Sequence, residues 1–324
     1  MAILLYQAIT EHLDDLKAKG RTRATLANHR QALMHAINAW GNLDCRDIHE
    51  EHVTQYFARR TWSSGTQMIY LGALRAFGCF LRRRGIWPRD FDPCEGWTVK
   101  TQTRVERLWL TVPQMIEMRE KEPCPRNRAL FALGMYTLGR SGELISLKIG
   151  DLDLERHNLV FYRHKTRQWD RLPVCQELGE AMTDWLDYYS TIMGGLDPTW
   201  LLVPAMAPIP MTGVTGEKRL VPSGAPRRMK PTTMISKPSW LASEALRRIG
   251  FREPGNALHV LRRSSARNMF EALRSDGYDH ALRRVASMLG HLHTSETEHY
   301  IGVDAERRAR DEMFAGKRMF PQAV

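Results

Sequence analysis

The sequence predicts a mainly α-helical protein with a small β-sheet, built as an N-terminal helical bundle followed by an α+β domain. Apolar residues recur at spacings of three and four over residues 1–90, the pattern of amphipathic helices. Pro88, Pro93 and Gly96 interrupt that pattern over residues 88–107. Two strand-like runs, 159–162 and 171–174, then stand among further helical segments. A chain of 324 residues has room for two domains.

The first 90 residues contain four helical patterns. A glycine follows three of them, as is typical of helix ends: Gly20, Gly41 and Gly85. Short loops between four helices favour a small bundle. We therefore expect a first domain at residues 1–90 and an interdomain linker at residues 91–107. The apolar stripes of the four predicted helices cover residues 4–16, 26–40, 53–57 and 69–81.

The second domain is expected over residues 108–324. An apolar helix is predicted over 129–138, and Ser141 suits the N-cap of a short helix that follows. Residues 204–233 are rich in proline, glycine and threonine, which predicts a long loop. Gly290 suits the left-handed position after a helix and would set His291 on a fixed turn. Further helices are predicted at 176–192, 234–249, 258–274, 279–289 and 304–315.

The chain carries a formal charge of +11, and both halves hold a surplus of basic residues. Such a balance favours a polyanionic partner, most often nucleic acid. Ordinary solvated charge on a merely basic protein is the alternative. The candidate phosphate contacts lie at helix ends and in the long loop: Arg59, Arg60, Arg82, Arg83, Arg84, Lys218, Arg219, Arg227 and Arg228.

The five cysteines are odd in number, widely spaced and without a C-x-x-C motif. This argues against a disulfide framework and against a structural zinc site. The N-terminus lacks the basic region of a signal peptide. The longest apolar runs are shorter than the roughly 20 residues that span a bilayer. We therefore expect a cytoplasmic protein with no membrane association.

Six residues form the candidate catalytic set. Five of them can supply hydrogen bonds or positive charge to a phosphate, and the sixth is a phenol that can attack one. His259 and Arg262 stand one helical turn apart and so share a face. Single motifs are weak, because H-x-x-R also occurs at His164/Arg167 and His280/Arg283. The six residues, in chain order, are Arg140, Lys165, His259, Arg262, His291 and Tyr300.

In this order and at these spacings, the set resembles the tyrosine recombinase (phage-integrase-like) family over nearly the whole chain. The resemblance implies a SAM-like helical core-binding domain and an α+β catalytic domain. Three features depart from the usual pattern: Leu138-Gly139 is reversed, Arg263 stands where histidine is frequent, and residues 205–233 are long. The matching positions are Thr137-x-x-Arg140-x-x-Glu143-Leu, Lys165, His259-Val-Leu-Arg262, Leu289-Gly290-His291 and Tyr300.

The resemblance also implies roles for these side chains. Arg140, Arg262 and His291 would hold the scissile phosphate, and Glu143 would orient Arg140. Tyr300 would attack, giving a 3′-phosphotyrosyl link and a free 5′-hydroxyl. His259 would exchange the proton. Lys165 would protonate the leaving oxygen. Neither a metal nor a cofactor is expected, because the phosphotyrosyl ester keeps the bond energy.

The implied partners are double-stranded recombination sites and three further copies of the chain. Such a homotetramer would exchange strands through a Holliday junction near the nucleoid, with or without an accessory protein. A C-terminal helix over 304–314 would dock on a neighbouring subunit or fold back. Integration or excision, cointegrate resolution and dimer resolution all stay open. The alternatives are a type IB topoisomerase and a non-catalytic DNA-binding module. A bundle followed by a linker favours the recombinase.

Overall fold

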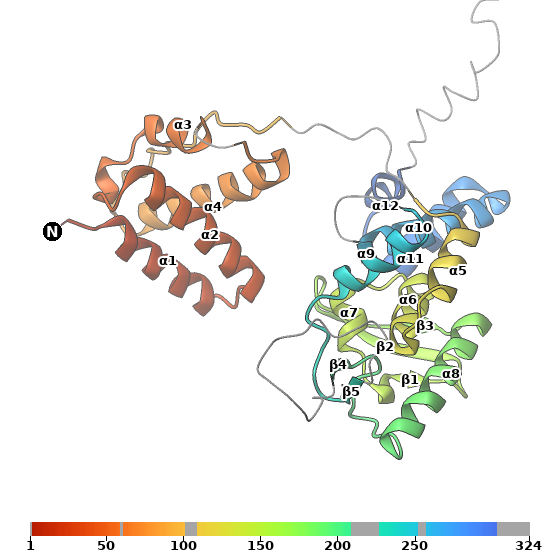
Figure 1. The fold of residues 1–324 in the computed structure, drawn as a ribbon. Coiled ribbons are helices and arrows are strands. Elements are labelled where there is room, and N and C mark those ends of the chain that lie inside the picture. The colour runs from red at the N-terminus through yellow and green to blue at the C-terminus, as the bar shows by residue number, and fades with distance from the viewer. Residues whose placement is uncertain (1, 59–60, 101–108, 209–226, 252–256, 303–324) are drawn as a thin grey trace, which may run out of the picture. The chain divides into compact units, whose positions relative to one another are not determined.

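The computed structural model describes residues 2–58, 61–100, 109–208, 227–251 and 257–302. The chain divides into two compact units, Met1–Arg104 and Val105–Val324 (Figure 1). The first unit is helical, and the second combines helices with two small antiparallel sheets. The predicted fold class is therefore confirmed.

The first unit contains the four predicted helices. Side-chain caps fix where two of them start: Thr22 Oγ1 accepts from the Thr25 amide at 3.2 Å and Ser63 Oγ from the Thr66 amide at 3.3 Å. Gly41 follows the second helix with φ of 81°, a backbone angle that glycine tolerates best. The helices are α1 (Leu5–Ala18), α2 (Arg23–Trp40), α3 (Glu50–Ala58) and α4 (Ser64–Arg83), with a 3₁₀ turn η1 at Cys45–Asp47.

Residues 91–99 pack on this bundle, although the sequence pattern predicts a linker there. Phe91, Trp97 and Val99 contact the bundle core, and Cys94 is buried in it. Arg75 and other side chains of α4 hydrogen-bond to the backbone of this stretch. Prolines and glycines end the helical pattern here, but the aromatic side chains still gain by leaving water.

The second unit contains eight helices in the part of the chain that the structure describes. Two of them, α5 and α12, were not among the predicted helices, and α9 begins four residues later than expected. The predicted helix over 304–315 lies outside the described residues. The helices are α5 (Val112–Glu120), α6 (Pro125–Thr137), α7 (Ser141–Ser146), α8 (Gln176–Met193), α9 (Pro238–Arg248), α10 (Ala257–Leu273), α11 (Tyr278–Leu289) and α12 (Thr294–Ile301), with 3₁₀ turns η2 (Ile149–Asp151) and η3 (Arg274–Asp276).

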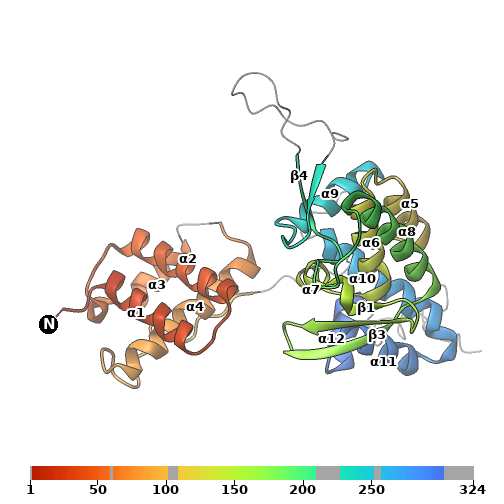
Figure 2. The ribbon, with the colours of Figure 1, turned by 90° about the horizontal axis from the view of Figure 1, so that it is seen from below.

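Two separate sheets lie in this unit (Figure 2). The first has the order β1 (Leu152–Asp153), β2 (Asn158–Arg163), β3 (Gln168–Pro173), all antiparallel. The second pairs β4 (Ala205–Pro208) with β5 (Arg227–Lys230). The predicted loop over 204–233 is thus wrong at both ends. Short strands brought together by long-range pairing leave little local signal.

Helix α6 is the centre of the unit's main core. From Ala129 to Met135 it is buried around its whole circumference, and Leu130, Phe131 and Leu133 are completely buried, as expected for a central helix. A second cluster joins α10, α11 and α12 through residues such as Phe270 and Val285. The side chains described next lie at the ends of α6 and α11, at the starts of α7 and α10, and in α12. No described helix is long and apolar enough to cross a membrane.

Candidate active site

The turn between α6 and α7 places Arg140. Leu138 adopts a left-handed conformation with φ of 52°, and a Cβ on Gly139 would lie 2.4 Å from Leu144 Cδ2. The Leu-Gly order therefore suits this turn, which has no room for a side chain at the second position. Arg140 itself is the N-cap of α7. The prediction of Ser141 as N-cap is therefore wrong by one residue. The Glu143 carboxylate accepts from the amide of Arg140, the residue before Ser141.

Glu143 is a buried carboxylate, 2% exposed, that contacts both candidate clamp arginines. It accepts from the Arg140 amide at 2.7 Å and from Arg140 Nη1 at 3.0 Å. Its Oε2 atom also lies 4.0 Å from Nη1 of Arg262. One carboxylate thus fixes the direction of Arg140 while remaining within ion-pair range of Arg262.

Arg262 projects from α10 and is 2% exposed. Its Nη1 donates to the Leu138 carbonyl, and its Nη2 donates to the Leu289 carbonyl at 2.9 Å. These carbonyls lie at the ends of α6 and α11, where helices leave acceptors free. Burial, more than any neighbouring charge, lowers the pKa of Arg262 to about 10. The guanidinium therefore remains charged at neutral pH.

Tyr300 lies against Arg262 and both histidines. Its hydroxyl is 3.3 Å from Nδ1 of His259 and 3.5 Å from the carbonyl oxygen of that residue. The Tyr300 ring centroid is 5.8 Å from Arg262 Cζ and 5.7 Å from the His291 ring centroid. Helix α12, which supplies Tyr300, packs on α10 and α11 through Ile301. The structure therefore brings Tyr300 of α12 beside His259 of α10, which lies 41 residues earlier, and beside His291 in the turn after α11.

The protonation states of this group suit proton transfer from the phenol to the imidazole. Burial raises the pKa of Tyr300, although Arg262 and Arg263 pull it back, so the phenol keeps its proton. Desolvation, followed by the charge of Arg262, lowers the pKa of His259, although the residue as a whole is exposed. A neutral imidazole can accept a proton from a neutral phenol.

His291 follows the glycine that ends α11. Gly290 adopts φ of 64°, which confirms the predicted left-handed position. Nδ1 of His291 lies 2.9 Å from Oγ1 of Thr297, a fully buried residue of α12, and this contact orients the ring. Burial, followed by the charges of Arg262 and Arg140, lowers the pKa of His291 to about 4. The ring is therefore neutral until an anion arrives.

Lys165 is exposed in the four-residue turn between β2 and β3. Arg163, two residues earlier, donates to the Leu289 carbonyl at 3.0 Å, so the turn starts beside the end of α11 that precedes His291. Lys165 is the candidate that the structure ties least to the rest. The other five are joined by contacts through Glu143, Leu289 or the Tyr300 ring.

The candidate DNA-contact residues divide into four groups. Arg83 pairs with Asp15 at 3.0 Å and Arg84 with Glu11 at 2.9 Å, both on exposed surface. Arg82 instead donates to the Phe91 carbonyl at 2.7 Å and is 18% exposed. In β5, Arg228 is exposed. The following predicted contacts lie outside the described residues or, for the last, have a side chain outside them: Arg59, Arg60, Lys218, Arg219 and Arg227.

Sequence reasoning did not identify two residues beside this site. Thr297 belongs to a helix that was not predicted. Arg163 is the last residue of β2 and is 3% exposed. A signal for Arg163 exists, because it shares the inward parity of Leu159 and Phe161 in β2. A charged residue at an inward position of a strand needs buried partners.

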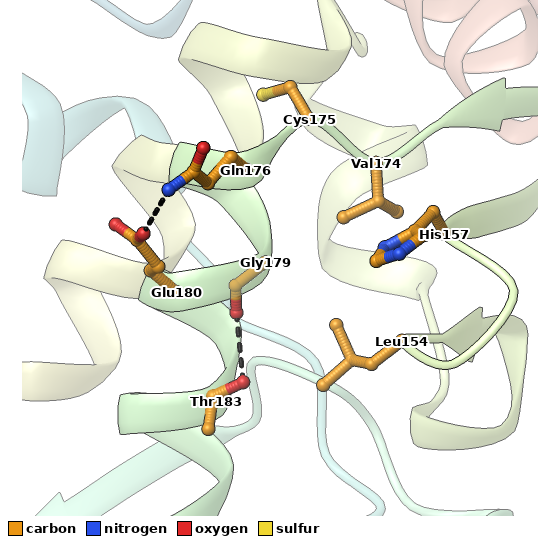
Figure 3. A pocket seen from close by; sticks show the side chains of 8 residues that line it. All are labelled: Leu154, His157, Val174, Cys175, Gln176, Gly179, Glu180 and Thr183. Carbon is orange, nitrogen blue, oxygen red and sulfur yellow. Dashed lines mark hydrogen bonds between the residues drawn. The ribbon is translucent and has the colours of Figure 1, made fainter.

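A surface depression of about 630 Å³ lies elsewhere on this unit (Figure 3). Its walls come from the β1–β2 turn and the start of α8, and include His157, Cys175 and Glu180. Neither lysine nor arginine lines it, and Gln176 hydrogen-bonds to Glu180 at 2.9 Å along α8 on one wall. The depression therefore lacks the cations that a phosphate needs. The described residues also contain no cluster of metal-ligating side chains.

Several solved structures share this fold. A lambda integrase dimer bound to a COC' core site is 16% identical, with a TM-score of 0.66 over 99% of this chain and 81% of that one. A lambda integrase tetramer bound to a Holliday junction is 17% identical, with a TM-score of 0.63 over 91% and 79%. XerH recombinase in a post-cleavage complex with difH is 17% identical, with a TM-score of 0.63 over 93% and 82%.

A comparison with curated protein sequences found no match. The profile of the phage integrase family matches residues 110–307. That segment is more than half of the chain, and it contains all six candidate catalytic residues. The chain therefore belongs to the phage integrase family and is a DNA recombinase of the tyrosine type.

Proposed function

We propose that this protein is a site-specific recombinase that cuts and rejoins DNA through a 3′-phosphotyrosyl intermediate at Tyr300. One observation supports the proposal most strongly. The Tyr300 hydroxyl lies 3.3 Å from a histidine nitrogen, while its ring lies 5.8 Å from a buried guanidinium carbon. A nucleophile, a proton acceptor and a phosphate ligand thus stand within one group of side chains.

In the proposed reaction, the Tyr300 oxygen attacks the phosphorus and the bond to the 5′-oxygen breaks. The phenolic proton goes to His259 Nδ1, and Lys165 gives a proton to the leaving 5′-oxygen. Arg140, Arg262 and His291 stabilise the charge on the non-bridging oxygens. Because these donors are held before DNA arrives, little reorganisation is needed during the reaction. A 5′-hydroxyl from a partner strand then attacks the phosphotyrosine and restores the phosphodiester.

The wider setting of the reaction is also part of the proposal. Solved relatives include a tetramer on a Holliday junction, which supports exchange of one strand pair at a time by four copies of this chain. The basic balance of +11 supports contact with double-stranded DNA by both units. Integration or excision of a mobile element, cointegrate resolution and dimer resolution use the same chemistry. The choice among them depends on the target site and on any accessory protein.

Covalent capture tests the proposal on DNA of every sequence at once. The full-length protein is incubated with a library of nicked duplexes of random sequence, in which the fragment released by cleavage diffuses away. Adducts that survive denaturing detergent are recovered and their DNA is sequenced. We expect wild-type adducts to concentrate on one sequence, linked through the 3′-phosphate. Tyr300→Phe should bind the same DNA and form no adduct.

A matched control separates this result from a general effect of losing a phenol. Tyr189 in α8 is fully buried, and its hydroxyl has no hydrogen-bond partner among the described residues. Tyr189→Phe should therefore keep the adduct. If wild-type protein forms none on any sequence, the chain acts as a DNA-binding module instead. Relaxation of any supercoiled plasmid, without sequence preference or exchanged products, would favour a type IB topoisomerase.

A further inference from the structure

Arg163 is a buried cation that the proposed reaction does not use. It ends β2 and stands two residues before Lys165. Its side chain is 3% exposed and points inward, on the same face as Leu159 and Phe161. Burying a guanidinium is costly unless each edge finds an acceptor. The partners of Arg163 therefore indicate what it holds together.

Those partners join the hairpin to the end of α11. Nε of Arg163 donates to the carboxylate of Asp170 on the neighbouring strand β3. Nη1 donates to the Leu289 carbonyl at 3.0 Å and Nη2 to the Met288 carbonyl at 2.9 Å. Both carbonyls lie in the last turn of α11, which carries partial negative charge. One side chain thus binds the β2–β3 hairpin to the helix that precedes His291.

The turn after α11 is shaped around this guanidinium. A Cβ on Gly290 would lie 2.6 Å from Cζ of Arg163, far inside van der Waals contact. The Leu289 carbonyl that accepts from Arg163 also accepts from Arg262 Nη2 at 2.9 Å. His291 is the next residue after Gly290. Arg163 therefore lies beside two candidate phosphate ligands. It shares the Leu289 carbonyl with Arg262, and it packs against Gly290, the residue before His291.

We infer that Arg163 is a positioning residue that holds the Lys165 turn beside the Leu289–His291 turn. The inference rests on the proposed function, in which Lys165 protonates the leaving oxygen. The turn itself is held to β2 by a hydrogen bond from the Arg167 amide to the Arg163 carbonyl at 2.8 Å, and Lys165 is exposed. Without the Arg163 contacts, the tip of the hairpin can pivot. Proton transfer then suffers, because it needs hydrogen-bond reach at the reacting atom.

Changing the leaving group tests this inference. At the cleavage site found by covalent capture, the bridging 5′-oxygen of the scissile phosphate is replaced by sulfur. A thiolate leaves without help from a general acid, so cleavage no longer needs Lys165. We expect Arg163→Met to slow adduct formation on the ordinary substrate by about 10–100-fold. On the sulfur substrate, the same variant should be within about threefold of wild type. Lys165→Ala should show the same pattern, and Arg163→Lys should recover part of the ordinary rate.

Two further variants distinguish positioning from general stability. Arg126 in α6 is another buried arginine, 4% exposed, that donates to the Pro204 carbonyl at 3.0 Å. Arg126→Met should affect both substrates equally. Asp170→Asn removes the counter-ion of Arg163 at a position that is 31% exposed, so it decides the question if Arg163→Met does not fold. We expect it to slow the ordinary substrate selectively as well.

The outcomes separate this inference from the proposed function. Selective rescue of Arg163→Met or Asp170→Asn by sulfur supports the positioning role. Equal losses on both substrates overturn it, as does a Lys165→Ala defect that sulfur does not relieve. Absence of any adduct with wild-type protein, on either substrate, refutes the proposed function itself.

Discussion

The two units differ in what they bury. Among the described residues, the buried arginines and carboxylates belong to the second unit: Arg126, Arg163, Arg262, Glu122 and Glu143. Among the described residues of the first unit, the buried polar side chain is His12. The ion pairs that Asp15 and Glu11 form in this unit lie at the surface. The first interior is instead a cluster of aromatic and aliphatic side chains.

This difference reflects what each interior has to do. Burying charge stabilises a fold weakly or not at all, because desolvation offsets the gain from pairing. Burial does hold charged donors in fixed directions, which transition-state stabilisation requires. The second unit buries Arg163 and Arg262 against carbonyls at helix ends, and Arg262 lies against the Tyr300 ring. The described residues of the first unit include no buried arginine. Its aromatic and aliphatic core suits the proposed role, in which this unit holds DNA and takes no part in the chemistry.

The largest expected effect concerns Glu143. Glu143→Gln removes a buried negative charge that lies beside two arginines, and breaking such an arrangement costs about 3 kcal/mol. Asp15→Asn is the matched change in the first unit, where the carboxylate is 29% exposed and pairs with Lys19 and Arg83. It should cost less than about 1 kcal/mol. Urea unfolding of the full-length variants measures both. Equal losses would remove the contrast between the units.

The next effect concerns the pH dependence of cleavage. His259 must be neutral to accept the phenolic proton, and its pKa lies below the ordinary value of 6.5. Adduct formation should therefore be level above pH 6.5 and fall by about tenfold per pH unit below the lowered pKa. His259→Gln should be slower by about 100-fold and lose this dependence. A wild-type rate that rises on acidification would contradict the role of His259 as base.

The first unit should show its own pH dependence, in stability. Burial and then the neighbouring His29, whose Nδ1 lies 3.2 Å from Nε2 of His12, lower the pKa of His12 to about 4. The unfolded chain binds a proton near pH 6.5 and the folded unit only near pH 4. Stability is therefore complete above pH 6.5 and lost as the pH falls through this window, by at most about 3 kcal/mol.

Hydrogen exchange in peptides from α1 and α4 measures this loss, with α6 and α8 as internal controls. His12→Leu should flatten the dependence in the first unit and leave α6 and α8 unchanged. A wild-type protein in which α1 and α4 keep constant protection from pH 7 to pH 4 would show that His12 does not titrate as expected.

The smallest effects separate the arginines that end α4. Arg84 is 59% exposed in its pair with Glu11, so Arg84→Gln should cost less than about 0.5 kcal/mol. If it contacts phosphate as proposed, the log–log salt slope of DNA binding should fall by about one unit. Arg82→Gln should leave the slope unchanged and loosen residues 91–99. A slope that changes for Arg82 alone would reverse this assignment.

Much of this protein was predictable because its signals are local. The helices of the first unit follow from apolar periodicity and capping residues. The β2–β3 hairpin follows from two strand-like runs around a polar turn, although β3 begins three residues before the predicted run. Gly290 was recognisable as a helix end because few other residues tolerate its backbone angle. The family resemblance rested on six residues whose types and order are visible in the sequence.

The tertiary structure alone decided how those residues share their partners. Glu143 contacts both Arg140 and Arg262, and one carbonyl of Leu289 accepts from both Arg163 and Arg262. Arg163 and Leu289 are 126 residues apart, and no periodicity or capping rule reports a contact over that distance. Similarly, β4 and β5 pair although 18 residues separate them in the sequence. Residues 91–99 join the first core although Pro93 and Gly96 interrupt their helical pattern. Local preference determines where helices and turns occur, whereas the cost of burying charge determines which distant groups must meet.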